Sequence, residues 1–169
     1  YELASALKEP PAIIDLTYAL EDLPHARLRS PLTESAAFAG APDTVHVIAH
    51  PAAVALALVL SRVHSAQPVR HAVAQVFEPA SERGQAGITE LQGQVTGLLS
   101  FRPYEKRVFD AQLGFNLLPR YGSDAPESLE SVEARIDRHL ATLLAGAVPM
   151  PSLRLVQAPV FHGHSISLW

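Results

Sequence analysis

The sequence predicts an α+β fold, with a mixed, mostly antiparallel sheet and helices packed on one face. Short segments with alternating apolar residues, such as Val69–Phe77, indicate strands. Longer segments with apolar residues three or four positions apart indicate amphipathic helices. The chain of 169 residues has a hydrophobic fraction of 48%. It is therefore long enough and apolar enough for one ordinary domain with a sizeable core.

The N-terminal part of the chain has the element order of a doubly wound α/β unit. Tyr1–Lys8 is typical of the last turns of a helix, which Glu9-Pro10-Pro11 would end. Ala12–Leu16 is predicted to be a short buried strand. Residues 18–43 contain three prolines and no sustained periodicity, so we expect a connection there. We place a domain boundary between residues 43 and 44.

The segment Thr44–Arg62 is predicted to be a strand that leads directly into a buried helix. Apolar residues alternate at its start, and an almost purely aliphatic run follows Pro51. Proline suits the first position of a helix, where its missing N–H is not needed. His50 would then be the N-cap. A helix N-terminus attracts anions and lowers the pKa of a thiol placed there. The residue in the first turn of this helix is Ala53, whose methyl side chain can do no chemistry.

The remaining elements follow from periodicity and from turn residues. We expect a helix from Gly84 or Gln85 to Ser100 and a second strand within Phe109–Leu118. A further helix should run from Ser128 or Leu129 to Leu144, with Ser128 as a plausible N-cap. The closing strands should be Ser152–Phe161 and Ser165–Trp169, hinged at His162-Gly163-His164.

Composition excludes several functions. The formal net charge is −4 and the basic residues are scattered, so nothing suggests a nucleic-acid or membrane partner. The longest apolar run, Ala52–Leu60, is too short to span a bilayer. The absence of cysteine excludes disulfides and thiol catalysis within these residues, and we expect a cytoplasmic location. Because the sequence begins inside a predicted helix and stops in a predicted strand, we expect a fragment.

Four segments resemble the aspartate-semialdehyde dehydrogenase family, in the right order. They are VIAHPAAV, AVAQVFEPASERGQAGITEL, FDAQLGFNLLPRYG and LVQAPVFHGHSISLW. The resemblance is closest to the cysteine-less, Usg-type members. It implies that residues 1–43 are the tail of a nucleotide-binding domain and its connection, and that residues 44–169 form the dimerisation domain. The implied fold is that of the C-terminal domain of glyceraldehyde-3-phosphate dehydrogenase.

Carrying the family's roles over to this sequence shows several losses. Ala53 stands at the position of the nucleophilic cysteine, and Glu78 at the glutamine beside it. Gln157 replaces the arginine that binds the substrate carboxylate. The acid–base histidine is kept as His164, and Glu90 matches a substrate-contacting glutamate.

The turn that receives the nicotinamide half of the cofactor reads Ser81-Glu82-Arg83-Gly84, with charged bulk where small residues are expected. Ser81 and Gly84 are the cofactor-binding positions that the resemblance implies. We expect no cofactor within this chain, whereas NADP would bind if an upstream nucleotide domain is intact.

These departures predict a catalytically inactive homologue whose domain mediates homodimerisation. The parent chemistry needs a thiolate to form a hemithioacetal, and a methyl side chain cannot begin that sequence. Losing the arginine guanidinium removes charge-assisted hydrogen bonds to the substrate carboxylate, each of which contributes roughly 1.5–3 kcal/mol. The alternative is an NAD(P)-dependent oxidoreductase that acts on an aldehyde or acyl phosphate, with altered or weak chemistry around His164.

Two histidine pairs invite a metal-site interpretation, but we favour another explanation for each. His162 and His164 have the i, i+2 spacing of a strand pair that faces one side. We interpret His164 as a relic acid–base residue and expect no metal. His46 and His50 straddle a strand-to-helix turn, so we interpret them as structural.

The last expectation is a two-fold homodimer formed through the sheet. Only 18% of the residues are charged. Alternate positions of Val69–Phe77 and Phe109–Leu118 leave apolar or uncharged residues on both faces. Because the helices cover one face, the other face would need a partner.

Overall fold

The computed structural model describes residues 12–34 and 44–169. The chain divides into two compact units. The first unit comprises Tyr1–Val69 and Arg138–Val148, and the second comprises Arg70–Asp137 and Pro149–Trp169. The predicted helix at Tyr1–Lys8 lies outside the described residues.

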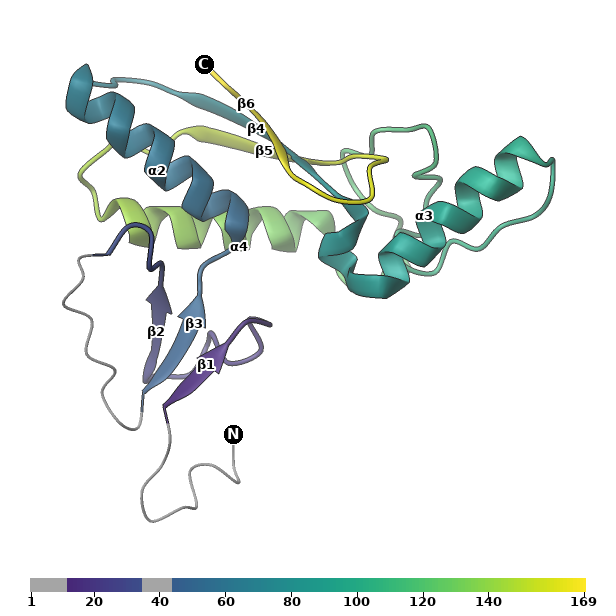
Figure 1. Cartoon of the computed structure of the whole chain (residues 1–169), viewed down its shortest axis with the longest axis horizontal. Helices are drawn as coiled ribbons and strands as arrows, with labels where there is room; N and C mark the ends of the chain where they lie inside the picture. The colour runs from purple at the N-terminus through teal and green to yellow at the C-terminus, as the bar shows by residue number, and fades with distance from the viewer. Residues whose placement is uncertain (1–11, 35–43) are drawn as a thin grey trace, which may run out of the picture. The chain divides into compact units, whose positions relative to one another are not determined.

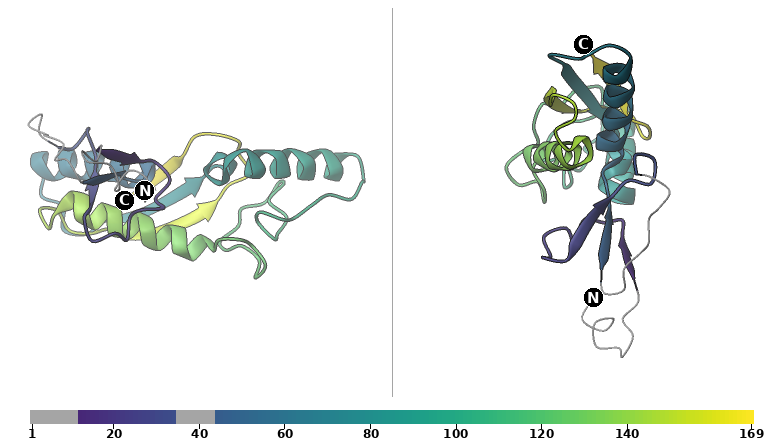
Figure 2. Two further views of the ribbon diagram at one scale, coloured as in Figure 1. Left: turned by 90° about the horizontal axis from the view of Figure 1, so that it is seen from below. Right: turned by 90° about the vertical axis from the view of Figure 1, so that its left-hand side faces the viewer.

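The first unit contains a three-stranded parallel sheet in the order β1-β3-β2 (Figures 1 and 2). The strands are β1 (Ile13–Asp15), β2 (Ala26–Arg29) and β3 (Val45–Ile48). Both outer strands run parallel to β3. Strands from both sides of the predicted boundary between residues 43 and 44 therefore share this sheet.

The helix α2 (Pro51–Ala66) follows β3, as the sequence predicts. Pro51 takes the first helical position, and the Nδ1 atom of His50 accepts a hydrogen bond of 3.2 Å from the backbone N–H of Ala52. His50 is therefore the N-cap. The buried side of the helix carries small and aliphatic side chains: Ala52, Ala53, Leu56, Ala57 and Leu60.

The second unit contains a mixed sheet in the order β5-β4-β6 (Figure 1). The strands are β4 (Val73–Glu78), β5 (Ser152–Gln157) and β6 (Ser165–Leu168). β4 pairs with β5 in parallel along its whole length and with β6 antiparallel. Because the pairing continues to the last residue of β4, Glu78 lies directly beside Gln157.

Three helical segments complete the described fold. A short 3₁₀ helix, η1 (Ala80–Arg83), follows β4 and leads into α3 (Gly84–Leu99). The last helix is α4 (Leu129–Leu144). The Oγ atom of Ser128 accepts a hydrogen bond of 3.1 Å from the N–H of Ser131, so the predicted N-cap is confirmed. The predicted bounds of both long helices agree with the structure to within one residue.

Three predictions about strands are wrong. The sheet of the second unit is mixed and that of the first is parallel, so the fold is not mostly antiparallel. Phe109–Leu118 forms no regular strand; it contributes one isolated bridge between Leu118 and Gln157. The expected connection 18–43 contains β2, because parallel pairing with β3 stabilises a segment without clear periodicity.

Each unit has its own buried apolar residues. In the second unit the largest buried side chains are Leu91, Phe109, Leu113, Leu129, Ile136 and Leu155. In the first unit they include Val45, Val47, Leu56, Leu60 and Leu140. Within the described ranges, no helix has the length and apolar character needed to cross a membrane.

Candidate functional site

The candidate site in the second unit is built around the adjacent ends of β4 and β5. Glu78 and Gln157 end these two strands, and both are 0% exposed. The Nε2 atom of Gln157 donates to the backbone oxygen of Glu78 at 2.8 Å. Its Oε1 atom accepts a hydrogen bond of 2.6 Å from the hydroxyl of Tyr121. The amide at position 157 is thus held by hydrogen bonds on both sides.

The buried carboxylate of Glu78 is paired with Arg83 of η1. The Nη2 atom of Arg83 lies 2.5 Å from Oε1 of Glu78, and its Nη1 atom pairs with Glu127. Glu127 also bonds Arg135 at 3.1 Å. The guanidinium of Arg83 lies 5.9 Å from the centroid of the Tyr121 ring. One arginine therefore serves two carboxylates and an aromatic ring.

Burial shifts the pKa values in this cluster. Burial raises the pKa of Glu78. The charge of Arg83 acts in the opposite direction, because it favours the ionised carboxylate, but the effect of burial is larger. Burial alone would lower the pKa of Arg83, but Glu78 and Glu127 more than offset it, so the pKa is raised. Burial also raises the pKa of Tyr121, which keeps its hydroxyl a donor to Gln157. The arrangement is therefore an ion-pair network closed by neutral hydrogen bonds.

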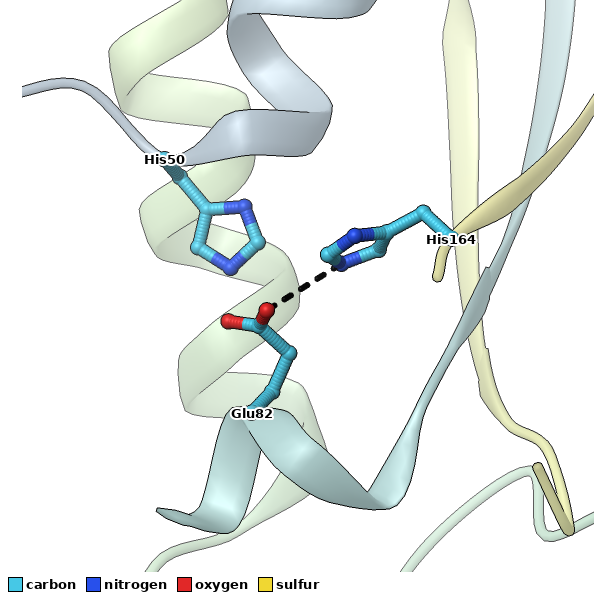
Figure 3. A group of neighbouring side chains, drawn as sticks. All are labelled: His50, Glu82 and His164. Atoms are coloured by element: carbon cyan, nitrogen blue, oxygen red, sulfur yellow. Dashed lines mark ion pairs between the residues drawn. The ribbon is translucent and has the colours of Figure 1, made fainter. Parts of the chain in front are cut away.

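His164 lies just before β6 and faces Glu82 of η1, with which it forms an ion pair when its ring is protonated. Figure 3 shows this pair, with 3.9 Å between the Nε2 atom of His164 and the Oε1 atom of Glu82. Their side chains are 15% and 24% exposed, respectively. Burial lowers the pKa of His164, and the charge of Glu82 acts in the opposite direction. His50, also drawn, belongs to the first unit.

The two charged residues of the 81–84 turn, Glu82 and Arg83, therefore each contact a residue that the family resemblance identifies as a site position. Arg83 binds Glu78, and Glu82 pairs with His164. Gly84 has a φ of 63°, a conformation that favours glycine and lets α3 begin immediately after η1. Ser81 is held by its N–H, which donates to the backbone oxygen of Phe161 at 3.0 Å.

Glu90 has a different environment from the other site positions. Its Oε2 atom accepts hydrogen bonds of 2.6 Å from the N–H groups of Arg107 and Val108. Its Oε1 atom accepts from the N–H of Phe109 at 3.3 Å and from the side chain of Gln94 at 3.1 Å. Both carboxylate oxygens hold the loop after α3 in place. The substrate contact implied for Glu90 stays a prediction.

The other residues singled out from the sequence lie elsewhere. Ala53 is in the first unit, in the first turn of α2, and is 0% exposed. His162 is exposed and belongs to no group of three possible metal ligands among the described residues.

His46 and His50 both take part in the local structure of the first unit. His46 accepts a hydrogen bond of 3.2 Å from Nε of Arg29. The N–H of His50 donates to Nδ1 of His139 at 3.0 Å, and the ring of His50 stacks on Tyr18. These contacts agree with the structural interpretation of both histidines.

Sequence reasoning missed four members of the site: Glu82, Arg83, Tyr121 and Glu127. The sequence shows that the 81–84 turn carries unusual charges, but it does not show which residues Glu82 and Arg83 contact. Glu127 is 44 positions from Arg83, and Tyr121 is 36 positions from Gln157. No local pattern reports such contacts.

Comparisons with known proteins point to one family. A family model described as the dimerisation domain of semialdehyde dehydrogenase matches residues 60–169. Among curated proteins, a USG-1 protein homolog of Pseudomonas aeruginosa is 39% identical over 88 residues, which cover 52% of this chain and 26% of that protein. The homolog of Azotobacter vinelandii is 36% identical over 68% of this chain and 34% of its own length. The aspartate-semialdehyde dehydrogenase of Rickettsia bellii is 30% identical over 73% of this chain and 37% of its length.

Solved structures agree. A probable aspartate-semialdehyde dehydrogenase from Pseudomonas aeruginosa matches 93% of this chain and 47% of its own, with a TM-score of 0.73 and 32% identity. Aspartate semialdehyde dehydrogenase II of Vibrio cholerae, complexed with ASA, matches 92% of this chain and 46% of its own. Its TM-score is 0.76 and its identity 22%, a likeness of fold alone. The chain thus spans less than half the length of each of these relatives.

Proposed function

The chain belongs to the semialdehyde dehydrogenase family, whose dimerisation domain matches residues 60–169, and from this premise we propose that it no longer carries out the parent reaction. In this proposal it is an aspartate-semialdehyde dehydrogenase-like protein whose remaining role is association with a second copy of itself.

The observation that carries the proposal is the alanine at the start of α2. Ala53 stands where the family resemblance places the nucleophilic cysteine, and these 169 residues contain no cysteine. A methyl group can form neither a hemithioacetal nor a thioester. The side chain is also completely buried, so no substrate atom could reach it without rearrangement. Covalent catalysis at this position is therefore lost.

The network around Glu78 supports the same conclusion. Gln157 stands at the position of the carboxylate-binding arginine, and its amide is already bonded to Glu78 and Tyr121. The nearby guanidinium, that of Arg83, is committed to Glu78 and Glu127. A substrate carboxylate would have to displace an internal carboxylate from Arg83. We infer that the binding site for the substrate carboxylate is lost as well as the nucleophile.

The 81–84 turn does not suit the nicotinamide half of a dinucleotide. Its two central side chains, those of Glu82 and Arg83, are large and charged; Arg83 pairs with Glu78, and Glu82 lies against His164. Small residues are what the resemblance implies there, because the ring must approach the backbone closely. We propose that this turn has exchanged a cofactor contact for internal ion pairs.

A dehydrogenase assay on the complete protein tests the loss of activity. We expect no phosphate-dependent reduction of NADP with aspartate semialdehyde above a no-enzyme control. Ala53→Cys should not restore the activity, because the substrate carboxylate would still have no arginine to bind it. Gln157 carries no charge, and Arg83 is already paired with internal carboxylates. Turnover by the unmodified protein would overturn the proposal.

Homodimerisation is supported by one face of the β4–β6 pair. Cross-strand register places Val73 beside Trp169, Gln75 beside Ser167 and Phe77 beside Ser165. None of these six residues is charged, and Val73 and Trp169 are 48% and 69% exposed. On this face of the sheet Arg154 of β5 lies beside Gln75 and supplies a charge, whereas the β4–β6 half keeps a valine and a tryptophan in water, which suits a protein contact.

The second candidate function is an oxidoreductase with altered chemistry around His164, and one observation favours it. His164 keeps a carboxylate partner, Glu82, and a carboxylate beside an imidazole can assist proton transfer. A nucleotide thermal-shift screen on the complete protein discriminates between the candidates. Stabilisation by NADP or NAD that His164→Ala abolishes would favour the oxidoreductase.

A further inference from the structure

We propose that the first unit holds a binding site for a small zwitterion, a molecule with the size and the charges of a free amino acid. The site is a cavity of about 360 Å³ between β2 and the C-terminal half of α4. All of its lining residues belong to the first unit, so the inference goes beyond the proposed self-association and does not depend on it.

The floor of the cavity is apolar. Ala26 and Leu28 line it from β2, and Val47 lines it from β3. Leu28 is paired with Val47 in the sheet, and residues two positions apart on a strand face the same side, so the three side chains share one face. Ligand cavities usually measure roughly 300–1,000 Å³, and this cavity is near the lower limit. It therefore suits a small molecule with a short aliphatic part.

The walls of the cavity carry charges of both signs. Glu21 and Asp22 line it from the loop between β1 and β2, whereas Arg27 and Arg138 line it from β2 and α4. A ligand with only negative charge would be repelled by the two carboxylates, and one with only positive charge by the two guanidinium groups. A zwitterion meets both requirements. Its ammonium group would bind the carboxylates, and its carboxylate would bind the guanidinium groups, which commonly hold carboxylates by paired hydrogen bonds.

Glu21 is fixed in position by a buried histidine. Its Oε1 atom accepts a hydrogen bond of 3.0 Å from Nη2 of Arg138, and its Oε2 atom lies 3.0 Å from Nε2 of His139. The side chain of His139 is only 5% exposed. Because Nδ1 of His139 accepts the N–H of His50, the proton of the neutral ring is on Nε2 and is donated to Glu21. The carboxylate is thus oriented before a ligand arrives, which lowers the entropic cost of binding.

The other charged groups keep hydrogen-bonding capacity for a ligand. Within residues 12–34 and 44–169, the side chain of Arg27 makes a single hydrogen bond, from Nη1 to the backbone oxygen of Ala26 at 3.1 Å. The side chain of Arg138 is 61% exposed, and a guanidinium group has several N–H donors besides the one that bonds Glu21. Asp22 is exposed. The cavity therefore combines an oriented carboxylate with accessible groups of both signs.

Calorimetric titration of the complete protein with glycine, L-alanine, L-serine and L-valine tests the proposal. We expect saturable binding of at least one of them, together with a shift of the His139 ring signals in NMR spectra, because His139 contacts Glu21. The N-acetyl derivative and the amide of the bound amino acid are the matched controls, since each lacks one of the two charges. Both should bind at least about tenfold more weakly. If none of the four amino acids binds, or if both derivatives bind equally well, the proposal is overturned.

Two variants locate the binding site. Asp22→Asn and Arg27→Met each remove one charge from the cavity at an exposed position, so the fold should be kept. Each should raise the dissociation constant of the bound amino acid about tenfold or more. Asp124→Asn and Arg62→Met are the matched controls, because both residues are exposed and neither lines the cavity. We expect the controls to bind like the unmodified protein.

Circular dichroism checks that each variant is folded. If Asp22→Asn and Arg27→Met bind the amino acid as tightly as their controls, the ligand lies elsewhere and this site is wrong. Light scattering of the same samples reports on self-association separately. A monomer that still binds the amino acid would overturn the homodimer and leave the cavity site standing.

Discussion

Arg83 is the residue on which the buried charges of the second unit depend. It neutralises Glu78, which is 0% exposed, and it joins Glu78 to Glu127. A buried charge is tolerated when it is paired, and removing one partner leaves the other without compensation. Because η1 follows β4 after a single residue, Arg83 can turn back onto the strand end that Glu78 occupies.

Replacing Arg83 should therefore be far more harmful than replacing an exposed arginine. We expect Arg83→Met to lower the free energy of unfolding by about 3–5 kcal/mol, because Glu78 would stay buried without its partner. Arg107→Met is the control, since Arg107 pairs with Glu105 at the surface and its side chain is 80% exposed. That change should cost less than about 1 kcal/mol. Urea unfolding measures both, and equal effects would contradict the role of Arg83.

The pKa of His164 offers a second test at this scale. Burial lowers this pKa from its ordinary value of 6.5, so neutral His164 stabilises the fold above that pH. The stability is lost as pH falls through the lowered folded-state pKa. Because Glu82 raises the pKa, Glu82→Gln should lower it further. NMR titration of the His164 ring measures this, with Glu105→Gln as the control. An unchanged pKa would show that Glu82 exerts no influence on His164.

At the scale of elements, α3 organises the loop that follows it. Glu90 binds three consecutive backbone N–H groups, those of residues 107–109. One turn later, the side-chain oxygen of Gln94 accepts from the N–H groups of Leu113 and Gly114 at 2.7 and 2.9 Å. The helix therefore replaces the hydrogen bonds that a strand would have supplied to this segment. This explains how Phe109–Leu118 stays ordered without joining the sheet.

Glu90→Gln tests this anchoring. An amide lacks the charge and the second acceptor oxygen, so we expect a loss of about 1.5–3 kcal/mol in unfolding free energy. Hydrogen exchange should become faster at the N–H groups of residues 107–109. Glu130→Gln, at an exposed position of α4, should change neither quantity. Unchanged exchange in Glu90→Gln would mean that other contacts hold the loop.

At the scale of the whole molecule, the proposed role is self-association. Light scattering coupled to size exclusion, at low micromolar protein, should give twice the 18.2 kDa of one chain. An obligate interface of this kind should exceed about 2,000 Å² in total. Val73→Glu should lower the mass toward one chain, because it places a charge on the uncharged face of β4 and β6. A mass near one chain for the unmodified protein would refute the dimer.

The sequence by itself determined the features that depend on neighbouring residues. The bounds of α3 and α4, the start of α2 at Pro51 and the N-cap at His50 follow from periodicity and capping within a few positions. The identity of Ala53 is likewise a local fact. It was enough to predict that a nucleophile is missing, because that prediction needs only the residue and the motif around it.

Only the tertiary structure decided the direction of the strands and the pairing of the charges. The helical segments η1, α3 and α4 lie between β4 and β5, and such a long crossover allows parallel pairing. Alternation along a strand does not show in which direction its neighbour runs. Likewise, Arg83 meets Glu127 across 44 positions. Sequence periodicity records which side of an element is buried; it does not record what covers that side, because the covering residues come from distant parts of the chain.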